Sequence, residues 1–286
     1  MVINVVTVNS GWILQKISER IVSEGNKLNH NFILSNRQRN DVDCNLYVDI
    51  QNCYHTKSGT LDIGLFTHAD KNDLNTVNKN CLSLDYIIHM SNRYYEMFGE
   101  IYPKEKMSVL YPSEVNTVFK QYKPKIGIFQ RGGHVGKGYD FMVNITNQEI
   151  IKDFRFKFMG KGWDYVINSM RQVGVECEYI DNEEYSEYEK HYHNVDYVLI
   201  PSIWEGGPMG ILEGLSCGKP IISSNVGFVG YDFNVDYTFE PNDINGLVNI
   251  LNDIKKPIED RRKSVSDVTY ENFTKGLIDI IFKIKK

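Results

Sequence analysis

Short apolar segments alternate with longer amphipathic ones along the chain, a pattern typical of β-α units on a parallel sheet. The first unit is the clearest. Val2–Val8 is predicted to be a buried strand, and apolar residues spaced three and four apart predict a helix over Ile13–Glu24, with Gly25 past its end. Further strands are predicted at Phe32–Leu34, Leu46–Ile50, Ile63–Phe66, Tyr86–His89, Ser108–Leu110, Lys125–Phe129, Phe156–Met159, Val175–Tyr179, Tyr197–Ile200, Pro220–Ser223 and Tyr237–Phe239.

The strands fall into two sets, and the stretch Tyr111–Pro124 between them has two prolines and no strong period. We place a domain boundary there, near residue 120, which gives domains over residues 1–120 and 121–267. The amphipathic stretch Val268–Lys286 predicts a last helix, which can pack back on the first domain. The expected fold is α/β, with two Rossmann-like, doubly wound domains facing across a cleft, and ligands bind beyond the carboxyl ends of such strands.

The composition is that of a folded protein, since 42% of the 286 residues are hydrophobic and 24% are charged. No apolar run approaches the ~18 residues of a membrane-spanning helix, and the N-terminus lacks the basic region and cleavage site of a secretion signal. Five cysteines without a CxxC pair favour reduced thiols in the cytoplasm over disulfides or a zinc site. The net charge of −5 gives no general attraction to nucleic acid.

The stretch Pro201–Pro220 carries most of the candidate chemistry. It follows the predicted strand Tyr197–Ile200, and Gly206 and Gly207 form a loop before Pro208, which suits the first position of a helix. A helix that begins there exposes backbone N–H groups, which together with the helix dipole form a site for phosphate. The N–H groups predicted to form this phosphate site are those of Met209, Gly210 and Ile211, and Gly207 in the loop is a further predicted donor-binding residue.

Two carboxylates frame the phosphate site. Glu205 precedes the loop, and Glu213 lies about one turn into the helix, which Gly218 ends as a left-handed cap. The combination of strand, Glu205, Gly-Gly-Pro, helix and Glu213 resembles the E-x7-E donor signature of retaining glycosyltransferases with the GT-B fold, family 4 in particular. The resemblance implies that Glu205 sits beside the hydroxyl groups of the donor sugar and that Glu213 binds the ribose of the nucleotide.

A second glycine-rich loop, Phe129–Asp140, carries two cations, Arg131 and Lys137. It is not a P-loop, because Arg131 stands in place of the first glycine and Gly138 in place of Ser or Thr. Fixed positive charge lowers the barrier to expelling a diphosphate, and Arg can hold phosphate oxygens bidentately. The two cations resemble the Arg…Lys-Gly pair of the same family, with a spacing one residue longer than usual.

Four thinner signals complete the site by resemblance to this family. Gly160 matches the glycine turn that the nucleotide approaches, and Ile180, at the end of a strand, matches a contact of the base, although simple packing explains it equally well. Gly11 occupies the turn after the first strand, where close approach to a diphosphate requires a small residue. His68 matches the active-site histidine that touches the donor sugar. His68, Arg131, Lys137 and Glu205 are the predicted catalytic residues.

The resemblance implies a retaining hexosyl- or pentosyltransferase with a nucleotide-diphosphate sugar as co-substrate, and with neither cofactor nor metal ion. The acceptor hydroxyl would attack on the face of the departing phosphate, which takes the proton. A glycan or a lipid-linked acceptor is expected, and nucleic acid stays open as an acceptor. His191, His193 and Glu189 are interpreted as a solvated helix surface and not as metal ligands. The expected location is the cytoplasm, with peripheral association at the inner membrane face left open.

Two alternatives remain. A phage-type DNA-base glycosyltransferase on the same fold fits the compact size, and its footprint would be basic surface around Lys120, Lys123 and Lys125. A non-catalytic partner subunit would bind nucleotide sugar without transfer or hydrolysis. An ordinary Rossmann dehydrogenase is disfavoured, because no G-x-G-x-x-G follows a predicted strand. The sugar, the base, the acceptor and the oligomeric state are left open by the sequence, because pocket shape decides the first three.

Overall fold

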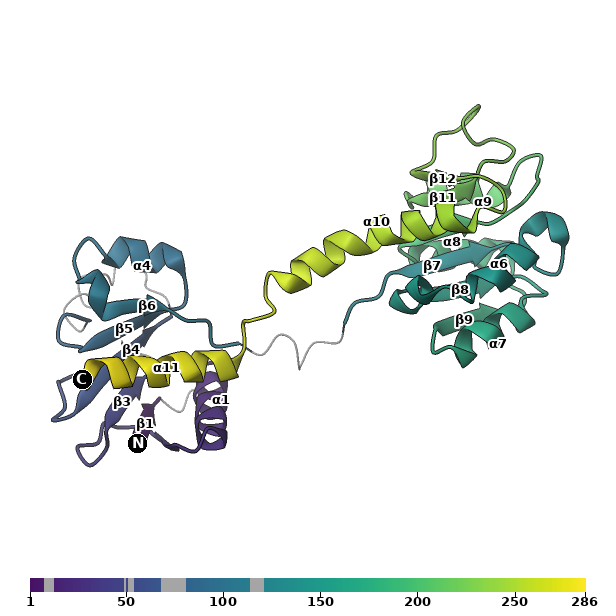
Figure 1. The fold of residues 1–286 in the computed structure, drawn as a ribbon. Helices are drawn as coiled ribbons and strands as arrows, with labels where there is room; N and C mark the ends of the chain where they lie inside the picture. Colours follow the sequence, from purple (N-terminus) through teal and green to yellow (C-terminus); the bar gives the residue numbers. More distant parts are fainter. Residues whose placement is uncertain (8–12, 49, 51–53, 68–80, 114–120) are drawn as a thin grey trace. The chain divides into compact units, whose positions relative to one another are not determined.

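The computed structural model describes residues 1–7, 13–48, 50, 54–67, 81–113 and 121–286 (Figure 1). The chain forms two compact units: unit 1 comprises Met1–Lys120 and Lys263–Lys286, and unit 2 comprises Gln121–Arg262. Each unit contains one six-stranded sheet whose paired strands all run parallel. The α/β class with parallel sheets, predicted from the alternating pattern, is therefore confirmed. The predicted arrangement across a cleft stays a prediction.

The sheet of unit 1 has the strand order β2-β1-β3-β4-β5-β6. Its strands are β1 (Val2–Val6), β2 (Asn31–Ser35), β3 (Cys44–Tyr47), β4 (Leu61–Phe66), β5 (Tyr86–His89) and β6 (Met107–Val109). Helices α1 (Ile13–Lys27) and α11 (Tyr270–Ile284) pack on one face, and α4 (Asn92–Phe98) packs on the other. The last helix of the chain thus completes the core of the first unit, where α11 lies beside α1 (Figure 1).

The end of α1 differs from the prediction. The helix was expected to stop before Gly25, but it continues to Lys27 and includes this glycine. Gly25 is buried, and a Cβ atom at this position would collide with the ring of Phe32 on β2. The glycine is therefore required by the close approach of helix and strand, and not by a left-handed turn.

The sheet of unit 2 has the strand order β12-β11-β10-β7-β8-β9. Its strands are β7 (Lys125–Phe129), β8 (Arg155–Met159), β9 (Glu176–Ile180), β10 (Tyr197–Ile200), β11 (Ile221–Ser224) and β12 (Tyr237–Phe239). Its α-helices are α6 (Tyr139–Ile145), α7 (Asp164–Gln172), α8 (Tyr188–His193), α9 (Met209–Ser216) and α10 (Ile244–Lys263), the last of which ends at the unit boundary. The chain proceeds from β7 outward on one side and then returns to β10 on the other. The strand order therefore reverses between β7 and β10, where doubly wound sheets bind ligands.

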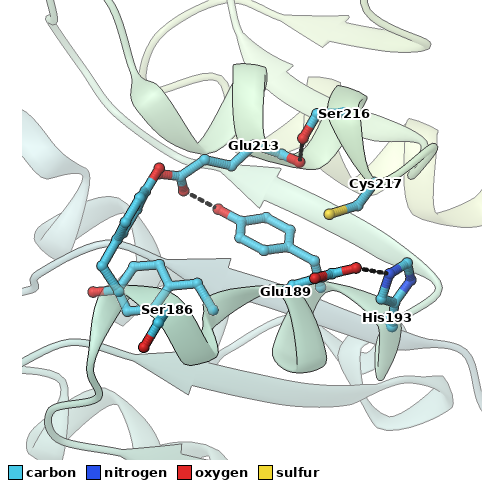
Figure 2. Close-up of a pocket in the computed structure, with 9 residues that line it drawn as sticks. Ser186, Glu189, His193, Glu213, Ser216 and Cys217 are labelled. Atoms are coloured by element: carbon cyan, nitrogen blue, oxygen red, sulfur yellow. Dashed lines mark hydrogen bonds and ion pairs between the residues drawn. The ribbon is translucent and has the colours of Figure 1, made fainter.

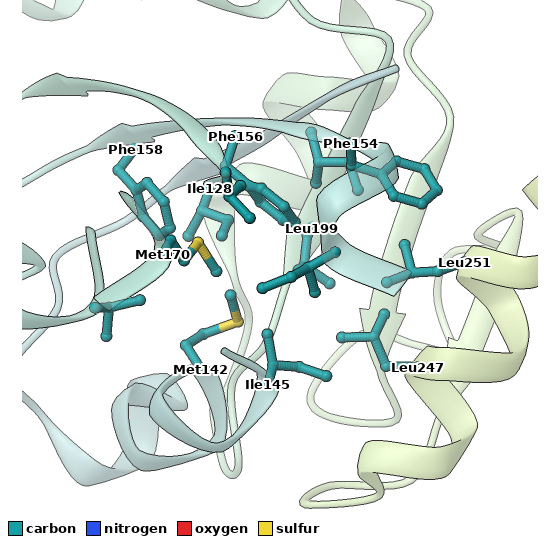
Figure 3. Close-up of a cluster of buried hydrophobic side chains, with 14 of the residues drawn as sticks. Ile128, Met142, Ile145, Phe154, Phe156, Phe158, Met170, Leu199, Leu247 and Leu251 are labelled. Atoms are coloured by element: carbon teal, nitrogen blue, oxygen red, sulfur yellow. The ribbon is translucent and has the colours of Figure 1, made fainter. Parts of the chain in front are cut away.

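Both faces of this second sheet are covered by apolar side chains. On one face, Ile128, Phe156 and Leu199 from the strands meet Met142 of α6 and Leu251 of α10 (Figure 3). On the opposite face, a smaller buried cluster joins the strands to α8 and α9. Because both faces are closed by packing, the loops at the ends of the strands are the places left for a ligand.

A histidine lies inside the core of unit 1. His89 ends β5 and is fully buried, with its ring against those of Phe66 and Phe98. Its Nε2 atom lies 3.3 Å from Sδ of Met107, and its Nδ1 atom has no hydrogen-bond partner among the described residues. Burial disfavours the charged ring and lowers the pKa of His89 to about 4. The ring is therefore neutral in the folded protein at neutral pH.

This buried histidine makes the stability depend on pH. In the unfolded chain, His89 takes up a proton below about pH 6.5, whereas the folded protein excludes that proton down to about pH 4. The unfolding free energy should therefore fall as the pH falls, by about 2 kcal/mol from this residue at pH 5. Urea denaturation at pH 7 and pH 5 measures the loss, which His89→Leu should remove. The exposed His193 supplies the control, since His193→Gln should keep the wild-type dependence; an unaltered dependence in His89→Leu would contradict the assignment.

Candidate active site

Two loops meet where the strand order of unit 2 reverses. The first follows β7 and runs from Gln130 to Gly138, and the second follows β10 and runs from Pro201 to Pro208. Strands β7 and β10 are paired neighbours and run parallel, so the two loops begin side by side at the carboxyl ends of these strands. The predicted residues Arg131 and Lys137 lie on the first loop, and Glu205 and Gly207 lie on the second. The topology thus brings together two stretches of chain about seventy residues apart.

The first loop is shaped by one short helical turn and by glycine. A 3-10 turn covers Val135–Lys137, and the ring Nδ1 of His134 accepts a hydrogen bond from the N–H of Gly136 at 3.1 Å. Gly138 follows with φ +75°, a left-handed conformation, and begins α6. A Cβ atom there would collide with the carbonyl oxygen of Pro201 on the second loop. Only glycine therefore allows the two loops to approach so closely.

Hydrogen bonds join the loops directly. The N–H of Ile203 donates to the carbonyl oxygen of Gly136 at 2.8 Å. The side-chain amide of Gln130 donates to the carbonyl oxygen of Lys137 at 2.8 Å, and its oxygen accepts from the hydroxyl of Ser202 at 3.3 Å. Gln130 and Ser202 were missed by the sequence analysis, and the signal for them is their place one and two residues after the ends of β7 and β10. They fix the backbone that carries Lys137.

The result is an ion pair between two of the predicted catalytic residues. Nζ of Lys137 contacts Oε1 of Glu205, with 24% and 13% of the two side chains exposed. The other carboxylate oxygen of Glu205, Oε2, is buried and has no hydrogen-bond partner among the described residues. An unpaired buried acceptor is costly, so this oxygen is suited to receive a hydrogen bond from a bound hydroxyl group. Arg131, on the same loop, is exposed.

Helix α9 begins directly after the second loop. Pro208 is the N-cap residue, one position before the helix proper, where the prediction had placed it inside the first turn. The N–H of Ile211 already donates to the carbonyl oxygen of Pro208 at 3.1 Å. The helical pattern therefore leaves the N–H groups of Met209 and Gly210 for an anion, so the predicted phosphate site is smaller than expected. Gly218 ends the helix with φ +64°, which confirms the predicted left-handed cap.

Gly207 and Gly210 also have packing reasons to be glycine. A Cβ atom on Gly207 would collide with the ring of Phe228, and one on Gly210 would lie 2.9 Å from Cδ1 of Ile200. The loop and the first turn of α9 are thus pressed onto the sheet edge and onto the segment after β11. This packing sets the direction in which the helix start points.

Glu213 lies on α9 at the rim of a pocket of about 510 Å³ between α8 and α9 (Figure 2). The hydroxyl of Tyr192 donates to Oε2 of Glu213 at 2.5 Å. Burial and this hydrogen bond to the carboxylate raise the pKa of Tyr192, and the charge of Glu213 raises the pKa of Tyr185. The residues that line the pocket are Tyr185, Ser186, Tyr188, Glu189, Tyr192, His193, Glu213, Ser216 and Cys217.

A second hollow, of about 280 Å³, lies at the ends of β7, β8 and β9. Arg131, Gly160 and Tyr188 line it, and Tyr188 also lines the pocket of Glu213. Gly160 has φ +115°, and a Cβ atom there would lie 2.7 Å from the carbonyl oxygen of Gln130. Ile180 packs into the apolar cluster beneath α8 and accepts a backbone hydrogen bond from Gly160 at 2.9 Å. Two adjoining hollows that share one tyrosine suit an extended ligand.

Two predicted residues, Gly11 and His68, lie outside the described residues, and their roles stay predictions. Within the described ranges, no three His, Cys, Asp or Glu side chains are arranged to hold a metal ion. The predicted solvated surface is correct for His193 and Glu189, which are exposed, but wrong for His191, which is buried. The two histidines contact separate carboxylates, of Glu183 at 3.1 Å and Glu189 at 3.2 Å. Of the helices that the structure describes, none combines the length and the apolar character needed to cross a membrane.

One family model matches the part of the chain that contains this site. Residues 123–255 match the family model described as glycosyl transferases group 1. The matched residues lie within unit 2. The matched range contains both loops, α9 and both hollows, so the whole candidate site in unit 2 lies inside the part of the chain that is similar to this family. No sequence among curated proteins is a match for the chain.

Several solved structures are similar over nearly the whole chain. The lipopolysaccharide outer core galactosyltransferase WaaB in its apo form is 15% identical, with 99% of both chains covered and a TM-score of 0.41. HepE of Anabaena, in complex with UDP-glucose, is 12% identical, with 99% of this chain and 98% of that chain covered and a TM-score of 0.39. A glycosyltransferase of Rickettsia africae is 14% identical, with 100% of this chain and 98% of that chain covered and a TM-score of 0.39.

Proposed function

We propose that the protein is a retaining glycosyltransferase that moves a hexosyl or pentosyl group from a nucleotide-diphosphate sugar to an acceptor hydroxyl. The observation that carries this proposal is the partly buried pair of Lys137 and Glu205, which lies just before the start of α9 in the range that matches the glycosyl transferases group 1 model. A cation, a helix N-terminus and a carboxylate with an unpaired oxygen are the groups that a sugar diphosphate requires. GT-B architecture and a glycan or lipid-linked acceptor belong to the same proposal.

The donor would extend from the start of α9 toward α8. The N–H groups of Met209 and Gly210 and the cations Lys137 and Arg131 would hold the diphosphate. Glu213 would bind the ribose, at the rim of the larger pocket. The base would enter the hollow beside Gly160 and Ile180, which Tyr188 connects to that pocket.

In the transfer step, the bond between the anomeric carbon and the diphosphate oxygen breaks, and its electron pair stays on the diphosphate. The acceptor hydroxyl attacks the same face of the sugar, and its proton passes to the departing phosphate. Lys137 and Arg131 stabilise the negative charge that grows on the leaving group, while Glu205 holds the sugar. Because side chains and a helix start supply the positive charge, we propose that no metal ion is needed. Activity that survives chelation by EDTA is the result to expect.

Nucleotide binding gives the first test. A nucleoside diphosphate at a hundred times its dissociation constant should stabilise the wild type by about 2.7 kcal/mol. Melting curves with UDP, GDP, ADP and dTDP should show this shift for at least one nucleotide. Glu213→Ala should abolish it, because the ribose loses its carboxylate partner.

The shift of each variant is compared with its own unliganded curve, because Glu213→Ala also removes the partner of the Tyr192 hydroxyl. Glu149→Ala serves as the control, since Glu149 is an exposed carboxylate paired with Lys152. Its shift should equal that of the wild type. No shift with any of the four nucleotides, or an equal shift in Glu213→Ala, would contradict the proposed donor site.

A further inference from the structure

The contact between Lys137 and Glu205 has a consequence for any anion that binds there. The ammonium group of Lys137 is already neutralised by a carboxylate, and both side chains are largely buried. A diphosphate bound at Lys137 brings further negative charge close to the same carboxylate. Like charges at short range in a partly buried site repel strongly, since little water lies between them to screen the field. Glu205 and a bound diphosphate therefore compete for the ammonium group of Lys137.

Hydrogen bonds between the loops hold the backbones of Lys137 and Glu205 close to each other. The backbone near Lys137 is held by the amide of Gln130, and the backbone near Glu205 is held by the hydrogen bond from Ile203 to Gly136. Ser202, fully buried, links the two loops through the side-chain oxygen of Gln130. The two charged side chains can rotate, but their Cα positions are fixed relative to each other. A shift of one loop alone therefore cannot increase the distance between a bound diphosphate and the carboxylate of Glu205.

The second oxygen of Glu205 distinguishes two kinds of ligand. Oε2 is buried and has no hydrogen-bond partner among the described residues. The hydroxyl groups of a donor sugar can donate hydrogen bonds to this carboxylate. These hydrogen bonds offset the free energy that is lost when the contact of Glu205 with Lys137 weakens. A nucleoside diphosphate without its sugar supplies no such donor. The same carboxylate therefore favours the intact donor and disfavours the product.

We propose that Glu205 is an internal competitor that helps to expel the nucleoside diphosphate after sugar transfer. This inference rests on the proposed function. Once the sugar has left, the diphosphate faces an uncompensated carboxylate, and Lys137 returns to Glu205 as the product departs. The ion pair in the structure is then the resting state to which each turnover returns.

The test is the affinity for product when the charge of Glu205 is removed. Glu205→Gln keeps the shape of the side chain and should bind the same nucleoside diphosphate about tenfold more tightly than the wild type, which corresponds to about 1.4 kcal/mol. Isothermal titration with UDP, GDP, ADP and dTDP measures this difference at a fixed salt concentration. Glu205→Met, also uncharged, should tighten binding as well, and it keeps the test open if one variant folds poorly. Glu149→Gln, which removes an exposed carboxylate, should bind like the wild type.

Two results would overturn the proposal in different ways. If the wild type binds one nucleotide and neither uncharged Glu205 variant binds it more tightly, the competitor role is wrong and the proposed function stands. If neither the wild type nor the variants bind any of the four nucleotides, the proposed function fails and this inference fails with it.

Discussion

Replacing Lys137 by methionine should lower kcat for sugar transfer by about 10²- to 10³-fold, the loss typical of removing one fixed group that stabilises developing negative charge. Methionine keeps the length and apolar stem of the side chain but removes the ammonium group that faces Glu205. The departing diphosphate then gains charge without the cation of Lys137. The rate of nucleoside diphosphate release, measured with the nucleotide sugar that binding identifies, reports this loss.

Two further variants decide whether the effect belongs to the charge of Lys137. Lys137→Arg keeps a cation and should recover part of the rate, although a guanidinium group spreads its charge over a different geometry. Lys152→Met removes a lysine from an exposed pair with Glu149 and should leave kcat unchanged. A Lys137→Met enzyme with wild-type kcat would refute the role of this residue in stabilising the leaving group.

Most strands could be predicted because a parallel strand covered on both faces is a short apolar run. Tyr86–His89, Lys125–Phe129 and Tyr197–Ile200 have the predicted bounds. The strand expected over Leu46–Ile50 instead covers Cys44–Tyr47. Its start was predicted too late because the strand contains a buried polar residue. Asn45 is fully buried and hydrogen-bonded to Asn4 on the neighbouring strand at 2.8 Å. Such a satisfied polar residue in the core breaks the apolar pattern from which the strand was predicted.

The sequence also indicated the candidate residues of unit 2, because glycines and charges gather after β7 and β10. It could not show how these residues meet. The link between Gln130 and Ser202 spans 72 positions, and the partner of Glu213 is Tyr192 on another helix. Neither contact has a local pattern, since each depends on the order of the strands. Spacing along the chain therefore predicted the candidate residues, whose roles stay predictions, and only the topology gives their partners.

The close approach of the two loops leads to the largest effect on stability. Gly138→Ala should destabilise unit 2 by about 2–5 kcal/mol, because a left-handed alanine costs about 1–2 kcal/mol and an overpacked contact adds about 1–3 kcal/mol. The new methyl group would collide with the carbonyl oxygen of Pro201, a backbone atom that cannot rotate away. Urea denaturation, followed by the fluorescence of Trp163 and Trp204 in unit 2, measures the loss.

Gly174 provides the matched control for this experiment. It has φ +87°, close to the +75° of Gly138, but a Cβ atom there would meet nothing within 4 Å. Gly174→Ala should therefore cost only the conformational part, about 1–2 kcal/mol. If the two variants lose the same stability, the contact between the loops contributes nothing beyond backbone strain. A larger loss in Gly138→Ala, together with a fall in nucleotide affinity, would show that the glycine is needed to hold the loops of Lys137 and Glu205 together.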